Sequence, residues 1–168
     1  AFGLFPISWI VFWAIALFRV SVDTGKFEII KASVGRLTSD PRLQAILIGF
    51  AFGAFVEGAA GFGTPVAVAA AMLTGLGFSP FNAAAICLLA NTSPVAFGSI
   101  GIPVITLAGI TGLPLYSLSA QFGRICAPIS LIIPAYWILA MGGRIALKEL
   151  LPAVAAAGVT FAAVQFAV

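Results

Sequence analysis

The sequence predicts an all-α polytopic membrane protein, and three observations support this fold class. First, 62% of the 168 residues are hydrophobic and 8% are charged, against about 45–50% and about 25% in an ordinary soluble domain. Second, residues 58–123 carry no charged side chain, although about 20 apolar residues suffice for one membrane crossing. Third, glycine and proline interrupt the apolar segments without a fixed period, which is typical of helix ends and breaks. Soluble enzymes and disordered chains are therefore excluded.

The sequence predicts a single, incomplete transmembrane domain over residues 1–168, which begins with two helices. Residues 1–22 predict a transmembrane helix, and residues 25–38 predict a short amphipathic helix at the membrane surface. The apolar face of the second helix comprises Phe27, Ile30, Val34 and Leu37. The basic residues between Arg19 and Arg42 place this segment on the cytoplasmic side. A solvated loop is the alternative interpretation of the same segment.

A re-entrant helical hairpin is predicted for residues 43–79. Residues 43–57 and 66–76 each fit a helix, but 15 residues rise only about 22 Å, which is less than the roughly 30 Å of the hydrocarbon core. The turn between the two helices is rich in helix-breaking residues, namely Gly58, Gly61, Gly63 and Pro65. Backbone that is not helical at this depth must be buried in protein or line a cavity.

The rest of the chain predicts a broken helix followed by two further spans. Residues 81–110 are interrupted by Asn91–Pro94, and helices are then expected over residues 118–141 and from residue 152 to residue 168. Basic residues at positions 144 and 148 indicate a second cytoplasmic segment. If both basic segments are cytoplasmic, the membrane is crossed an even number of times between them, which agrees with a hairpin that does not cross.

Glu57 is the strongest single candidate for function. It lies immediately before the glycine-rich turn, where a carboxylate at mid-depth costs at least about 2.5 kcal/mol on insertion scales. Burial favours the neutral, protonated form, which suits a proton carrier in a coupled transporter. A structural ion pair is the alternative. Arg124 is the candidate charge partner for Glu57 or for substrate, although an arginine near the outer face can also extend to the membrane surface.

The two helix breaks are the candidate substrate site. Broken helices leave free N–H groups and the positive end of a half-helix dipole, which together can bind a carboxylate without a buried cation. The candidate residues are Gly61, Gly63 and Thr64 at the first break, and Asn91, Thr92 and Ser93 at the second. Helix capping is the alternative role for these side chains.

Several enzyme signatures are absent from the sequence. The chain has no histidine, which excludes histidine-based triads and zinc sites with histidine ligands, and it has no Walker A motif for ATP. The sequence therefore predicts a protein that is not an enzyme. It needs no cofactor or metal ion and has no nucleic-acid partner.

The segment GFAFGAFVEGAAGFGTPVAVAAAMLTGLGFSP, followed by LLANTSPVAFGSIGIP, resembles the bacterial L-lactate permease family, which includes glycolate permeases. The resemblance implies uptake of a small 2-hydroxy monocarboxylate with a proton across the bacterial inner membrane. It also implies half of an inverted-repeat carrier, which contains a horizontal amphipathic helix, a re-entrant hairpin and a broken helix. Family members are longer, so an N-proximal fragment is implied. Thr64 and Ser93 depart from the family pattern, in which alanine is usual.

Other functions stay open at this stage. A carrier for a different organic anion, such as gluconate or a dicarboxylate, is the nearest alternative, and a channel-like or structural membrane subunit is another. The predicted partners are a small carboxylate, a proton, the lipid bilayer and the remainder of the same polypeptide. A homo-oligomer also stays open.

Overall fold

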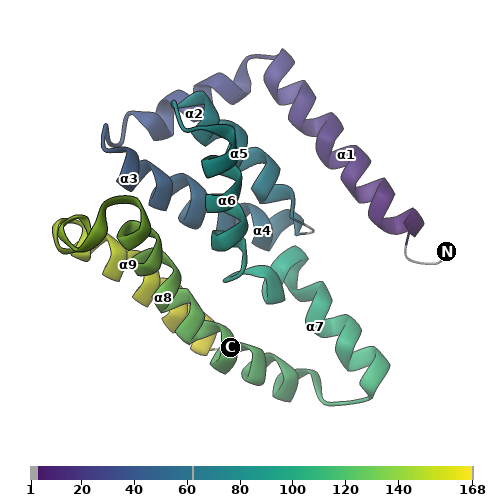
Figure 1. Cartoon of the computed structure of the whole chain (residues 1–168). Helices are drawn as coiled ribbons and strands as arrows, with labels where there is room; N and C mark the ends of the chain where they lie inside the picture. The colour runs from purple at the N-terminus through teal and green to yellow at the C-terminus, as the bar shows by residue number, and fades with distance from the viewer. Residues whose placement is uncertain (1–3, 62, 168) are drawn as a thin grey trace.

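A computed structural model describes residues 4–61 and 63–167, and within them every regular element is a helix (Figure 1). The elements are α1 (Leu4–Asp23), α2 (Lys26–Gly35), α3 (Pro41–Gln44), the π-helix η1 (Ala45–Phe52), α4 (Gly53–Ala60), α5 (Thr64–Gly75), α6 (Pro80–Asn91), the 3₁₀-helix η2 (Val95–Phe97), α7 (Gly98–Thr111), α8 (Leu115–Glu149) and α9 (Leu151–Phe166). Among the residues that the structure describes, two helical runs, and a third if a bent pair counts as one, are long and apolar enough to cross a membrane. The predicted class of an all-α polytopic membrane protein is confirmed.

The predicted bounds agree with the structure for α1 but not for α2. Helix α1 agrees with the segment expected over residues 1–22, of which the first three lie outside the described residues. Helix α2 ends at Gly35, earlier than predicted, and Leu76 packs so closely there that a Cβ at Gly35 would lie 3.3 Å from its side chain. Phe27 is buried as expected, whereas Leu37 lies beyond the helix and is exposed. The side chains of Ile30 and Val34 are not among those described.

Residues 41–76 form a helical hairpin. Its first arm, α3 with η1 and α4, runs from Pro41 to Ala60 and is long enough to span, so the expectation of a 15-residue arm was wrong. The arm is longer because it begins at Pro41, where the Asp40 side chain accepts a hydrogen bond from the backbone N–H of Arg42. The second arm, α5, returns to α2, and a Cβ added at its last residue, Gly75, would lie 3.0 Å from the Lys31 side chain. The second arm of the hairpin therefore ends beside α2.

A packed core holds the hairpin against α6 and α8. Its members include Ile48, Phe50, Met72, Leu73, Ile86 and Trp137, all nearly inaccessible. Phe50 also makes an edge-to-face contact with Phe161 of α9, with ring centroids 5.5 Å apart. A Cβ at Gly49 would lie 2.6 Å from the Trp137 ring, so this glycine lets the two elements approach. In a membrane such contacts stabilise by close packing rather than by excluding water.

The predicted broken helix is confirmed as α6 and α7, which are bent by 67° at the break. The break is longer than the sequence indicated. A helix was expected from residue 95 onward, but η2 is followed by three residues with left-handed φ, namely Ser99, Ile100 and Gly101. Helical geometry resumes only after Gly101.

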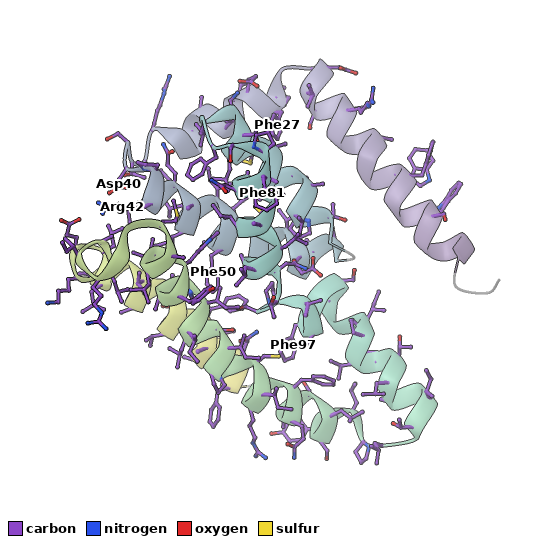
Figure 2. All side chains as sticks on the ribbon, viewed as in Figure 1. Phe27, Asp40, Arg42, Phe50, Phe81 and Phe97 are labelled. Atoms are coloured by element: carbon purple, nitrogen blue, oxygen red, sulfur yellow. The ribbon has the colours of Figure 1, made fainter. Side chains whose placement is uncertain are left out.

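Helix α8 contains the expected span over residues 118–141 and continues to Glu149, with non-helical geometry at Gly143 (φ 68°). Arg42 joins the end of α8 to the start of the hairpin, because its guanidinium lies 2.8 Å from Asp40 and 2.9 Å from Glu149. This arginine also holds the pKa of Asp40 below its ordinary value through a side-chain hydrogen bond. The two basic segments therefore lie at the same end of the molecule (Figures 1 and 2).

Candidate functional site

The two helix breaks meet in space. The hydroxyl group of Ser99, in the α6–α7 break, donates a hydrogen bond of 2.6 Å to the carbonyl oxygen of Ala60, the last residue of α4. The next residue, Gly61, has φ 66° and ψ −162°, a backbone conformation that is essentially restricted to glycine. A Cβ at Gly61 would overlap the Ser99 side chain and lie 2.9 Å from its backbone nitrogen. The contact between the breaks therefore requires a glycine at this position.

Glu57 lies one helical turn before this contact, and its carbonyl oxygen accepts a 2.8 Å hydrogen bond from the N–H of Gly61. Its residue exposure is 1%, and its Oε2 atom has no hydrogen-bond partner among the described residues. The backbone N–H of Gly63 interacts with the same carboxyl group. Gly98, the first residue of α7, packs against it so closely that a Cβ there would lie 2.6 Å from Glu57 Oε1. One helix break thus supplies the carboxylate, and the other supplies the backbone that covers it.

A cavity of about 410 Å³ opens beside Glu57, within the roughly 300–1,000 Å³ typical of small-molecule sites. It is lined by Glu57, Gly63, Val95, Gly98, Ser99, Ile102, Pro103 and Thr106. Glu57 is the only charged residue in this lining. The N-terminal end of α5, at Thr64, adjoins the cavity beside Gly63, and the regular part of α7 begins in the cavity lining at Ile102, so two half-helix dipoles present positive potential to it. Such a cavity favours an anion when Glu57 is neutral.

The residues predicted at the second break lie beside this cavity rather than in its lining. Asn91 ends α6, and its Oδ1 atom is buried without a hydrogen-bond partner. Ser93 is fully buried, and its Oγ is likewise unpartnered. Thr92 is exposed and bonds back to the Leu88 carbonyl at 3.4 Å, which is a capping role. Within the described residues, these three buried polar atoms without partners, including Glu57 Oε2, all lie near the two breaks.

Arg124 is not brought to Glu57. It is exposed and lines a different, mainly apolar groove of about 520 Å³ between α8 and α9. No ion pair involves Arg124 within the described ranges. The proposed charge pair between the two residues is therefore absent, because α8 presents Arg124 toward α9 and not toward the hairpin.

Sequence reasoning missed several residues that build the site. Gly98, Ser99 and Thr106 line the cavity, yet they lie in what was taken for a regular helix. Gln165 and Ser130 are buried polar residues on α9 and α8 that hydrogen-bond to each other. The available signal was the presence of an amide at position 165 within an otherwise apolar helix, since a buried polar group needs a partner.

This arrangement resembles the discontinuous helices of secondary transporters. In such proteins, discontinuous helices place their free ends around a buried site, where irregular backbone is sheltered from lipid. The particular family follows from comparison with known proteins. A family model described as L-lactate permease matches residues 1–168, and the chain belongs to that family.

Individual relatives agree with this assignment. The chain is 52% identical over 165 residues to an L-lactate permease of Bacillus subtilis (strain 168), and 48% identical over 166 residues to one of Escherichia coli (strain K12). It is 47% identical over 165 residues to the glycolate permease GlcA of Escherichia coli (strain K12). Each match covers 98% of this chain but only 29–30% of the relative. No solved structure matches the chain.

Proposed function

We propose that this chain is part of a bacterial inner-membrane carrier that takes up L-lactate, glycolate and similar 2-hydroxy monocarboxylates together with protons. The relatives' names support the substrate class, and the chain spans about 30% of their length. The two helix breaks would form part of the substrate site, and the remainder of the polypeptide would complete it. The observation that carries the proposal is the position of Glu57 in the cavity between the breaks.

The coupling mechanism follows from the charges around the cavity. A substrate carboxylate is attracted by the helix ends at Thr64 and Ile102 but repelled by an ionised Glu57. Protonation of Glu57 removes that repulsion and gives the side chain an O–H group that can donate to the substrate. Binding of the anion and binding of the proton therefore favour each other, which is the linkage that symport requires.

Substitution of Glu57 by glutamine tests this mechanism, because it keeps the volume and removes the titration. In the full-length transporter in proteoliposomes, Glu57→Gln should abolish lactate accumulation driven by a pH gradient. Exchange of labelled for unlabelled lactate should persist, because exchange needs no net proton movement. Glu28→Gln, which alters an exposed carboxylate on α2, is the matched control and should accumulate lactate normally. Unchanged accumulation by Glu57→Gln would place the proton site elsewhere.

The proposal includes a topology in which the hairpin, residues 43–79, enters and leaves on the cytoplasmic side. The contact of Gly75 with Lys31 and the ion pair of Arg42 with Glu149 support it, because they bring the basic segments to one end. Cysteines placed at Lys31 and Lys148 should react with impermeant reagents from the cytoplasm, and one at Leu113 from outside. Labelling of the first two from opposite faces would contradict this topology.

A further inference from the structure

A buried polar cluster links the α6–α7 break to the two C-terminal helices. The side-chain amide of Gln165 donates a 2.8 Å hydrogen bond from Nε2 to the backbone carbonyl oxygen of Ser93. The Ser130 hydroxyl donates to Gln165 Oε1 at 2.5 Å. Gln165 is 4% exposed, and Ser93 and Ser130 are both fully buried. One side chain of α9 is thus bonded to α8 and to the break at the same time.

The Ser93 carbonyl oxygen needs this donor because the helix is broken. In a continuous helix it would accept from the N–H of Phe97, four residues later. That N–H instead bonds to Pro94 at 2.9 Å in the 3₁₀ turn. A buried carbonyl without a donor is destabilising, and Gln165 supplies the donor that the break removes. The hydrogen bond therefore satisfies a buried carbonyl oxygen that the broken geometry leaves without its helical donor.

The orientation of the amide is set by Ser130. A hydroxyl group has one proton, and the contact with Gln165 Oε1 is shorter than the 3.0 Å contact with the Cys126 carbonyl oxygen. Because Oε1 is the acceptor for Ser130, Nε2 must face Ser93. The partners that hydrogen-bond to Gln165 within the described part of the chain are uncharged. Two titratable groups of α8 lie in this region, namely the Cys126 thiol, whose backbone carbonyl accepts from Ser130, and the Arg124 guanidinium, which lines the groove between α8 and α9.

Close packing of α8 and α9 holds Gln165 in place. A Cβ added at Gly123 of α8 would overlap the backbone oxygen of Gln165, and a Cβ at Gly158 of α9 would lie 3.3 Å from the backbone oxygens of Ser130 and Leu131. Two glycines, one near each end of this contact, allow the helices to approach. The position of the amide is thereby fixed by backbone contacts and not only by its own hydrogen bonds.

We infer that Gln165 is a positioning residue that maintains the α6–α7 break and so holds Gly98 and Ser99 at the substrate cavity. The inference rests on the proposed function, because the cavity that the break lines is the proposed substrate site. Gln165 itself lies outside the cavity lining. Loss of the hydrogen bond would lower the population of the binding-competent break. Apparent affinity would then fall with that population, while the maximal rate of exchange would change less.

Two substitutions in the full-length transporter test the inference by lactate exchange in proteoliposomes. Gln165→Leu removes the donor and should raise KM roughly tenfold with a smaller change in maximal rate. In Gln165→Glu, a protonated carboxyl group can donate to the Ser93 carbonyl, whereas an ionised one repels it. Relative to wild type at the same pH, its KM should approach normal at low pH and rise as the pH increases.

The matched controls are Gln121→Leu and Gln121→Glu, because Gln121 lies exposed on α8. Both should keep the wild-type KM across the same pH range. The inference is overturned if Gln165→Leu retains the KM of Gln121→Leu, or if Gln165→Glu follows wild type at every pH.

Hydrogen exchange separates this inference from the proposed function. Gln165→Leu should increase amide exchange in residues 92–101 of the purified transporter and leave residues 64–75 of α5 unchanged. Ser130→Ala removes the hydrogen bond to Gln165 Oε1 but keeps the Gln165 amide, so it should give a smaller increase in amide exchange in the same segment. If wild-type protein exchanges neither lactate nor glycolate, the proposed function fails, while this measurement still decides whether Gln165 maintains the break. Equal exchange in wild type and Gln165→Leu would overturn the inference.

Discussion

The two breaks that meet at Glu57 are built from different kinds of residue. The hairpin tip turns at Gly61 and Gly63, whose positive φ angles a glycine adopts without strain. The α6–α7 break passes through Ser99 and Ile100 at φ 48° and 58° before it reaches Gly101. Left-handed geometry costs an ordinary residue about 1–2 kcal/mol. The hairpin tip therefore has its shape from local sequence, whereas the second break depends on bonds from Ser99 and Gln165 to hold it.

The largest expected effect comes from replacing Gly61, the glycine with positive φ at the hairpin tip. In Gly61→Ala the alanine must adopt a backbone conformation that costs a non-glycine residue about 1–3 kcal/mol. Its Cβ also overlaps Ser99, and this overpacking costs about 1–3 kcal/mol more. We expect a strongly lowered melting temperature of the detergent-solubilised transporter and no lactate uptake. Gly109→Ala is the control, because an added Cβ there meets no atom within 4 Å. Equal melting temperatures for the two variants would show that the breaks do not touch.

Gly98→Ala should have the next largest effect. The backbone there, at φ −60° and ψ 153°, accepts alanine, so the whole effect arises from the 2.6 Å approach to Glu57 Oε1. We expect about 1–3 kcal/mol of destabilisation and a loss of lactate accumulation. Adding Glu57→Asp shortens the acid and should restore stability in the double variant. Failure of the shorter acid to restore it would mean that Gly98 acts on another neighbour.

Removal of the bond between the breaks should have a moderate effect. Ser99→Ala deletes the 2.6 Å hydrogen bond to Ala60 and should destabilise the protein by about 0.5–1.5 kcal/mol. Thermal unfolding of the variant beside Ser117→Ala, an exposed serine on α8, measures this difference. A result no different from the control would indicate that the second break keeps its shape without support from the hairpin.

The smallest expected effect is a gain in stability. Ile100 is 84% exposed and left-handed, so Ile100→Gly removes backbone strain and few contacts. After the greater entropy of a glycine in the unfolded chain is subtracted, we expect a net stabilisation of about 0.5–1 kcal/mol, measured as a raised melting temperature. A lowered melting temperature would indicate that the isoleucine side chain helps to hold the turn.

The same contrast explains what could be predicted from the sequence. Gly61, Gly63 and Pro94 are direct signals of breaks, and a carboxylate at position 57 in an apolar segment is a direct signal of a site. Ser99 and Ile100 give no such signal, because their conformation is imposed by neighbours distant in the chain. The partnership of Gln165 with Ser93 and the separation of Arg124 from Glu57 likewise depend on how α8 and α9 pack. The π-helical segment η1 follows no rule of composition that would have distinguished it from an α-helix.

Glu57 is the one charged side chain that the described residues contribute to the cavity lining, and on the proposed coupling this has a consequence for the energy source. On the proposed coupling, a substrate anion enters only when Glu57 carries a proton, so the loaded site adds no net charge. A membrane potential does work of about 2.3 kcal/mol per elementary charge for each 100 mV, and on a neutral pair it does none. Voltage clamped by potassium and valinomycin should then leave lactate uptake unchanged at a fixed pH difference. On the proposed coupling, the acidity gradient and not the electrical gradient would drive uptake.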